Sequence, residues 1–447
     1  MTRARDRKGG TVKRGRILAA FAAIGLIAAA CSSGGGGSSP SASGSAAPVT
    51  LTIWHNYGTN QSYQGLKNLA DAFHQLHPNI TVKVVNQPGT NYFSLLNAAA
   101  ISKSGPDLAV MWTGLFTIQY KSFLTNLKGI VPQSDLDKID PSALKYTADG
   151  FDAANGPYEI PFQRQFYIGF YNKAAFKKAG VKSVPTDWSQ LFSACQKLKT
   201  AGYMPMTYGN GGQPISTEFY PWEDLSYIMI GAYPVDQWIN VYNGQTQWNN
   251  PAIQAQLSTW AKLKTNGCTN SDVLTKTDNV TDFSTGKAAM IVDGTWDTQT
   301  FTKALGNNVG AFLPPFSNSP IKGVVDYAGD GLAMMNYTPH RTEAAEFLDF
   351  LTTSQAVAAV NAAGLIPALT GSSTSNPVNQ EMLDFAAKDG MVPYPMLDNV
   401  TQTDVVNTGS KELPSVLNGS ITPAAATQAM VATWNALPSD QKGSSYP

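Results

Sequence analysis

The side chains of this chain that are best suited to chemistry are aromatic and polar groups at the expected ends of strands. Trp54 and His55 follow one alternating apolar run, and Trp112 and Thr113 follow another. Rings can cover the apolar faces of a ligand, while imidazole and hydroxyl groups can hydrogen-bond its polar rim. Ligands of α/β sheets sit beyond the carboxyl ends of the strands. These residues therefore predict noncovalent binding of a neutral polar molecule.

Sequence motifs for catalysis or for metal binding are missing from the chain. It holds no Gly-x-Ser-x-Gly elbow, no His-Glu-x-x-His motif, no phosphate loop and no Cys-x-x-Cys pair. His74 and His77 lie three residues apart without a third ligand nearby, and the acidic run 135–140 lacks the glycine and glutamate of a calcium loop. We expect no enzyme activity, no metal and no cofactor.

The first 30 residues indicate export from the cytoplasm. A basic segment precedes the apolar run 17–30, and small residues stand before Cys31. This pattern predicts a signal peptide over residues 1–30, too short to span a bilayer as a mature helix. The run Ile27–Cys31 resembles a bacterial lipobox, with Ala28 where leucine is usual, and it predicts lipidation of Cys31. Ordinary signal cleavage with an incidental cysteine is the alternative.

A flexible tether is expected after the cysteine. Residues 32–48 contain no apolar side chain larger than alanine, so they cannot bury enough surface to offset chain entropy. Residues 31–48 are therefore interpreted as a lipidated Cys31 and a Gly/Ser linker with a span of roughly 20–25 Å. We expect the protein to be anchored to the outer face of the plasma membrane.

Charge and composition argue against a nucleic acid partner. The whole chain has 31 basic and 31 acidic residues. The first 30 residues hold seven of the basic side chains and one of the acidic ones. The rest of the chain therefore has 24 basic and 30 acidic residues, a net charge of −6. A mildly acidic surface attracts neither nucleic acid nor anionic lipid. Charged residues make up only 14% of the chain and aromatic residues 10%, which suits a neutral polar ligand. We expect a monomer.

Apolar periodicity predicts alternating strands and helices, and hence an α/β sheet with helices on its faces. The length of the chain leaves room for two or three domains. The expected strands are 49–53, 80–84, 107–111, 166–171 and 288–292 with one near 332, and the expected helices are 66–76, 92–102, 188–199, 252–264 and 343–363.

Two cysteines remain in the expected folded part. Cys195 shares a helical stripe with Leu191 and Leu198, which is typical of a buried thiol. A disulfide with Cys268 is the alternative, since the protein is expected outside the cytoplasm.

Five motifs stand in a fixed order along the chain. They are a "GPD" stretch, a strand followed by "YNK…F…AG", a "PTDW" helix start with Gln190 in place of the usual glutamate, a "GKAAM…GTW" stretch and a last crossover. These motifs occupy residues 105–107, 161–180, 185–191, 283–296 and 345–367. Together they resemble the family 1 extracellular solute-binding proteins, the carbohydrate-binding components of ABC importers. The resemblance covers most of residues 49–440.

The resemblance implies a two-lobed periplasmic-binding-protein-like fold of type II, with a ligand cleft between lobes joined by hinge crossings. The amino-terminal lobe would hold residues 49–158 and 313–363, and the carboxy-terminal lobe 159–312 and 364–447. A ligand that touches both lobes favours their closed arrangement, which a membrane permease would detect.

The family's cleft residues, carried over by position, fall on Trp54, His55, Asn56, Trp112, Thr113, Gln165, Tyr220, Trp222, Glu223, Trp296 and Asp297. Asp330, flanked by two glycines before a strand, is a further candidate. The expected function is capture of a mono- or oligosaccharide for an ABC importer.

Several alternatives stay open at this point. The ligand could be a peptide or a polyol, or the protein could be a tethered ligand sensor for a membrane kinase. An extracellular glycosidase would need two carboxylates about 5–9.5 Å apart, and Glu223, Asp293, Asp297 and Asp330 are its candidates.

Overall fold

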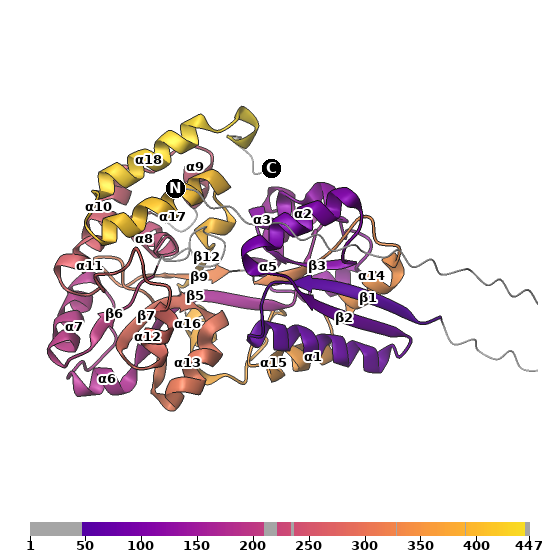
Figure 1. Ribbon diagram of the computed structural model, residues 1–447, viewed down its shortest axis with the longest axis horizontal. Coiled ribbons are helices and arrows are strands. Elements are labelled where there is room, and N and C mark those ends of the chain that lie inside the picture. The colour runs from indigo at the N-terminus through magenta and orange to yellow at the C-terminus, as the bar shows by residue number, and fades with distance from the viewer. Residues whose placement is uncertain (1–46, 210–220, 234–236, 328, 389, 443–447) are drawn as a thin grey trace, which may run out of the picture. The chain divides into compact units, whose positions relative to one another are not determined.

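Two β-sheets with helices packed around them form the folded part of the chain (Figure 1). The computed structural model describes residues 47–209, 221–233, 237–327, 329–388 and 390–442. The signal peptide, Cys31 and nearly all of the linker therefore lie outside the described residues. The first half below means the first sheet with the helices that contact it, and the second half means the second sheet with its helices.

The first sheet consists of five strands, of which three are parallel and β10 runs against its neighbours. β1 pairs in parallel with β2 and β3, whereas β10 runs antiparallel to β3 and β4. In β1, Leu51 and Ile53 are fully buried, and each such side chain contributes about 1.5–3 kcal/mol when buried. In sheet order the strands are β2 (Ile80–Asn86), β1 (Val49–His55), β3 (Leu108–Trp112), β10 (Asp330–Met334) and β4 (Ile160–Pro161).

Helix α1 shows how the local sequence positions the carboxyl end of β1. Asn60 caps the helix through its side chain, which accepts the backbone N–H groups of Ser62 and Tyr63. Phe73 packs edge-on against Phe347 of α14, which fixes the helix in the core. The helices of the first half are α1 (Gln61–Leu76), α2 (Tyr92–Ser102), α3 (Leu115–Ile118), α4 (Gln133–Leu136), α5 (Pro141–Leu144), α14 (Arg341–Phe350) and α15 (Ser354–Ala362).

The second sheet is built on the long strand β5, which pairs antiparallel with four other strands. Its strands are β12 (Val392–Tyr394), β9 (Gly323–Tyr327), β5 (Gln163–Asn172), β7 (Ala288–Gly294) and β6 (Met204–Met206), with β8 (Val309–Phe312) and β11 (Ile366–Pro367) paired to β5. The helices of this half are α6 (Lys173–Lys178), α7 (Trp188–Thr200), α8 (Asp224–Ala232), α9 (Trp238–Tyr242), α10 (Pro251–Trp260), α11 (Lys262–Thr265), α12 (Asn279–Ser284), α13 (Thr298–Leu305), α16 (Pro377–Ala386), α17 (Thr403–Leu417) and α18 (Pro423–Ala436).

The chain passes between the two sheets at three neighbouring points. It leaves β4 for β5 at residues 161–163, returns from β9 to β10 at 327–330, and reaches β11 after α15. Gln163 pairs with Pro367, and a Cβ at Gly329, which has a φ of +80°, would lie 1.8 Å from the Gln163 carbonyl oxygen. These contacts show that the three crossings lie side by side. Because they are so close, only glycine, which has no Cβ, fits at position 329.

Cys195 of α7 and Cys268 form a disulfide, so the thiol interpretation is wrong and the alternative holds. The bond ties α7 to the segment that runs beside β6, where Met206 N–H donates to the Cys268 carbonyl. No helix in the described ranges combines the length and the hydropathy that crossing a bilayer needs.

Two expected helices are broken in the structure. The expected helix 343–363 is two helices, α14 and α15, because Thr353 caps a new helix through its side chain. The expected helix 252–264 is likewise divided between α10 and α11 at Ala261. Residues 313–363 were expected in the amino-terminal lobe, but strand β9, which lies in this range, pairs in the second sheet. The chain therefore returns to the first sheet between β9 and β10.

Candidate functional site

His55 lies at the carboxyl end of β1 and is fully buried. Its Nδ1 accepts the Tyr57 N–H at 3.2 Å, so in the neutral ring Nε2 carries the hydrogen. The ring stacks on Tyr63 with centroids 5.2 Å apart. Burial lowers the pKa of His55 to about 4, so the ring stays neutral near pH 7. Its Nε2–H is a donor with no hydrogen-bond partner among the described residues.

An aromatic group surrounds Trp112 at the end of β3. The Trp112 ring meets Phe93 at 4.9 Å and Phe116 at 5.1 Å between centroids, in both cases edge to face. All three rings are only half-buried, so the group keeps an exposed apolar face. Phe93 and Phe116 were not among the predicted site residues. Phe93 lies in α2, the helix before β3, and Phe116 lies in α3, the helix after β3.

Asp330 is the cross-strand neighbour of Trp112, so the structure brings these two predicted residues together. Gln163, at the first crossing, donates through Nε2 to Asp330 Oδ2 at 3.2 Å and to Ser62 Oγ at 3.3 Å. Nearby Glu159 accepts a hydrogen bond from Thr117 and is fully buried. Burial raises the pKa of Glu159 well above its usual range, and the charge of Asp330 adds to the shift.

The turn after β7 carries Trp296 and Asp297 and touches the first half. Gln61 of α1 donates through Nε2 to the Thr295 carbonyl at 2.8 Å. The Trp296 ring folds over Gly294, where an added Cβ would lie 2.1 Å from it. Burial raises the pKa of Asp297 to about 6. The predicted pair at 296–297 is thus placed against the start of α1.

A second contact between the halves involves Thr113. Its carbonyl accepts a hydrogen bond from Asn399 Nδ2 at 2.8 Å, and Gly114, with a φ of +80°, leaves room for the Asn399 backbone. Asp398 beside it is buried, which raises its pKa to about 7. Thr113 itself is 1% exposed, and its Oγ1 has no hydrogen-bond partner in the described part of the chain.

Trp222 and Glu223 lie deeper in the second half, before α8. Trp222 is fully buried between Gly409 of α17 and the ring of Trp248. Glu223 is 4% exposed. This packing gives Trp222 a supporting position, and its contact with a ligand stays a prediction.

Four predicted residues need separate mention. Gln165 is buried on β5, one residue before Phe166, whose N–H donates to Thr295 Oγ1 at 3.1 Å. Trp54 and Asn56 flank His55 and are half-buried. Tyr220 lies outside the described residues.

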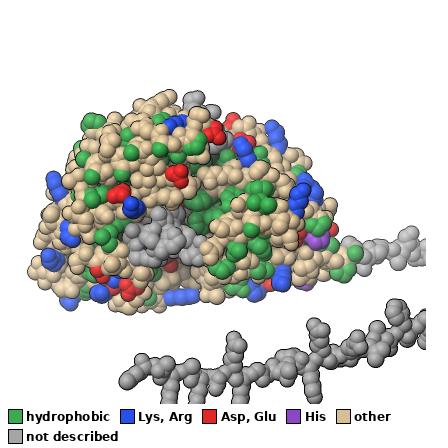
Figure 2. Space-filling model, turned by 45° about the horizontal axis from the view of Figure 1, so that its top comes forward, with side chains coloured by type: hydrophobic (Ala, Val, Ile, Leu, Met, Phe, Trp, Pro, Cys, Tyr) green, Lys and Arg blue, Asp and Glu red, His purple; other side chains and the backbone are tan. Residues whose placement is uncertain are grey.

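Several buried polar atoms at this junction have no hydrogen-bond partner among the described residues. Each lies at a strand end of the first sheet, at the start of α1 or at the first crossing. They are His55 Nε2, Asn56 Oδ1, Gln61 Oε1, Thr113 Oγ1 and Gln163 Oε1. Buried polar groups normally find a partner, so these donors and acceptors mark the junction as a candidate site. The face in Figure 2 is hollowed, with hydrophobic side chains exposed in the hollow.

A family model described as bacterial extracellular solute-binding protein matches residues 57–358. The chain belongs to this family. The resemblance read from the sequence motifs is thereby confirmed, and the solute-binding family consists of binding proteins that act outside the cytoplasm.

Individual relatives of this solute-binding protein agree with that assignment. The sn-glycerol-3-phosphate-binding periplasmic protein UgpB of Salmonella paratyphi A is 26% identical over 324 residues, which are 68% of this chain and 70% of UgpB. A solved chitin oligosaccharide binding protein superposes with a TM-score of 0.74 at 21% identity, covering 86% of this chain and 98% of that one. Maltose-bound MalE3 of T. maritima gives 0.69 at 18% identity, covering 86% and 98%. The expected two-lobed α/β fold is confirmed.

The candidate site also contains residues that the sequence did not single out. Gln61, Gln163 and Asn399 join elements far apart in the chain, so no local spacing marks them. Phe93 carries a weak local signal, because it follows Tyr92 at the start of an otherwise apolar helix.

Proposed function

We propose that this solute-binding protein captures a mono- or oligosaccharide outside the cell and delivers it to the permease of an ABC importer. The observation that carries the proposal is the set of buried, unpartnered donors and acceptors at the junction of the two halves, beside half-buried aromatic rings. A sugar matches both features, since it has apolar C–H faces and a rim of hydroxyl groups.

Uncharged hydroxyl groups fit this set better than ionic groups. The set includes a neutral imidazole N–H, the amides of Asn56 and Gln61, and the hydroxyl of Thr113. None of the site residues named in the described part of the chain is a lysine or an arginine. UgpB is named for a phosphate ester, and a phosphate would call for such a cation. The proposal therefore follows the chitin oligosaccharide and maltose binding proteins rather than UgpB.

Closure of the halves is the proposed signal to the permease. Gln61 to Thr295 and Asn399 to Thr113 are contacts that join the halves around the site. A ligand held by both halves shifts the equilibrium toward the closed arrangement by its differential affinity. No catalytic step is part of this function, and a bound sugar recovered intact after incubation would agree with it.

Attachment to the membrane belongs to the same proposal. The signal peptide, the lipidated Cys31 and the linker 31–48 would place the folded part at the outer face of the plasma membrane. Mass spectrometry of protein extracted from membranes would show a diacylglyceryl group on Cys31. An unmodified N-terminus near residue 31 would contradict the anchor without affecting the binding function.

Thermal melting against a panel of sugars tests the ligand class. A ligand at 100 times its dissociation constant adds about 2.7 kcal/mol to the free energy of unfolding, so its melt shifts clearly. The panel holds neutral mono- and oligosaccharides, sugar phosphates, polyols and peptides. A shift with neutral sugars alone supports the proposal. A shift with peptides, or with phosphates only, overturns the sugar assignment.

A further inference from the structure

Arg164 lies where the chain first crosses between the two sheets. It is the second residue of β5, and its side chain is 14% exposed. Nη1 donates to Asp140 Oδ2 at 2.7 Å, and Nη2 donates to Asp326 Oδ2 at 2.6 Å. One guanidinium thus holds two carboxylates that are mostly shielded from solvent.

The two carboxylates belong to different parts of the fold. Asp326 of β9 is the backbone partner of Phe166 in β5, so it is fixed within the second sheet. Asp140 caps α5, and its own N–H donates to the Ala368 carbonyl just after the third crossing. The chain after α5 is held to the first half, because Gly114 N–H donates to the Tyr146 carbonyl at 2.8 Å. Arg164 therefore spans from the second sheet to α5.

The ion pair leaves two groups unused. Arg164 Nε and Asp326 Oδ1 have no hydrogen-bond partner among the described residues. A guanidinium can pair side-on with one carboxylate through two parallel N–H groups. Side-on pairing of Nε and Nη2 with Asp326 would satisfy both unused groups within the second half, and it would release Asp140.

Ser142 adds a second choice of the same kind. Its Oγ lies 2.7 Å from Asp140 Oδ1 and 2.6 Å from Asp326 Oδ2. A hydroxyl has one hydrogen, so it donates to one of these carboxylates at a time. The Arg164 cluster, meaning Arg164, Asp140, Ser142 and Asp326, thus has a shared and a side-on arrangement.

We infer that Arg164 is a positioning residue for ligand capture, because the exchange of its cluster between the shared and the side-on arrangement sets how readily the two halves close. The inference rests on the proposed function for its ligand. In the shared arrangement Arg164 holds α5 to β5 while Gln61 and Asn399 join the halves. The Asp140 N–H bond to the Ala368 carbonyl remains without Arg164, but loss of the ion pair removes a side-chain hold on α5 and should favour separated halves. Buried pairs such as this one are weakly screened by salt.

The Asp140→Asn variant tests the shared arrangement. Asparagine caps a helix as well as aspartate does, so α5 keeps its start and only the charge is removed. We expect the affinity for the sugar found in the panel to fall about tenfold, a normal size for such coupling. We also expect a larger radius of gyration in X-ray scattering without ligand. Asp71→Asn is the matched control, since Asp71 pairs with Lys67 within one exposed helix turn, and it should change neither quantity.

The Asp326→Asn variant should not lower the affinity for the sugar, in contrast to Asp140→Asn. It weakens the side-on arrangement, so Arg164 should stay with Asp140, and the affinity should be equal to or higher than that of the wild type. A merely structural role would make both variants bind more weakly. Equal weakening of both, or an Asp140→Asn variant that matches the wild type in calorimetry and scattering, overturns the inference. If the wild type binds no sugar, the proposed function fails, while the scattering comparison still decides this inference.

Discussion

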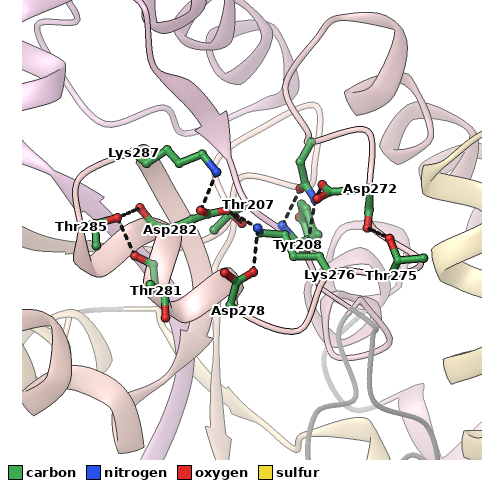
Figure 3. Close-up of polar contacts among 11 residues, drawn as sticks. Thr207, Tyr208, Asp272, Thr275, Lys276, Asp278, Thr281, Asp282, Thr285 and Lys287 are labelled. Carbon is green, nitrogen blue, oxygen red and sulfur yellow. Dashed lines mark hydrogen bonds and ion pairs between the residues drawn. The ribbon is translucent and has the colours of Figure 1, made fainter.

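Two regions of this protein bury many polar groups, and they differ in whether those groups are paired. Beside Thr207, which follows β6, Lys276 binds Asp278 at 2.9 Å and Asp282 at 2.7 Å, and Lys287 binds the other oxygen of Asp282 at 2.9 Å (Figure 3). At the junction of the halves, by contrast, His55 and Thr113 present buried atoms that no described residue satisfies. The charged groups around Lys276 are paired with one another, while the polar atoms at the junction have no partner among the described residues.

The difference separates stability from function. In the Lys276 network, burial lowers the pKa of the lysine, but its hydrogen bonds to Asp282 and Asp278 outweigh burial and raise it. The same contacts hold the pKa of Asp282 below its usual range against the effect of burial. A network of this kind stabilises the fold around Tyr208, which Asn270 also holds by two hydrogen bonds. The junction leaves desolvated groups unpaired, a cost that bound ligand would remove.

The largest expected effect is on stability. Lys276→Met keeps the aliphatic stem but leaves Asp282 buried with Lys287 alone, so we expect a loss of about 3 kcal/mol in the free energy of unfolding. Urea unfolding followed by circular dichroism measures it. The matched control is Lys67→Met in the exposed pair with Asp71, which should cost less than about 0.5 kcal/mol.

The sugar affinity of Lys276→Met is a second test of this prediction. If the Lys276 network serves stability only, Lys276→Met binds the sugar with unchanged affinity at a temperature where it is folded. A variant that is as stable as the wild type but binds more weakly would erase the contrast between the two regions.

The reverse pattern is expected for Trp296→Ala. The ring covers Gly294 and is half-buried beside the Thr295 contact with α1. Loss of about 2 kcal/mol of apolar contact with a sugar would weaken binding about thirtyfold. Calorimetry measures this, and urea unfolding should show a smaller loss than for Lys276→Met. Unchanged affinity would remove Trp296 from the site.

Local patterns in the sequence were sufficient for much of the fold. The alternation over Val49–His55 and the helical spacing over Tyr92–Ser102 correspond directly to β1 and α2. The break between α14 and α15 was missed because Thr353 caps a helix inside a continuous apolar pattern. Strand β9 was misplaced for a different reason, since its sheet is decided by pairing with β5, far away in the chain.

The candidate site was less accessible to the sequence. Strand ends predicted His55 and Trp112, because the carboxyl edge of a sheet follows from the strands themselves. Gln61 and Asn399 matter through contacts with Thr295 and Thr113, and those contacts exist only after the halves have come together. Trp222 packs against Gly409 of α17, a contact that no local pattern in the sequence indicates, and its contact with a ligand stays a prediction.

The smallest expected effect concerns pH and tests the unpaired side of the comparison. Burial lowers the pKa of His55 to about 4, so the ring is neutral from pH 5.5 to 8 and donates through Nε2 throughout. His55 should therefore contribute no change in sugar affinity over this range, and any change that remains should come from Asp297 or Asp398, whose pKa values burial raises to about 6 and about 7. Stability has a defined sign too: the unfolded His55 titrates near 6.5, so the folded state loses stability as the pH falls from about 6.5 toward 4. His55→Gln should remove that loss and weaken binding. A fall in wild-type affinity below pH 6.5 that His55→Gln abolishes would mean that His55 protonates in the folded protein, and it could not be the neutral donor of the site.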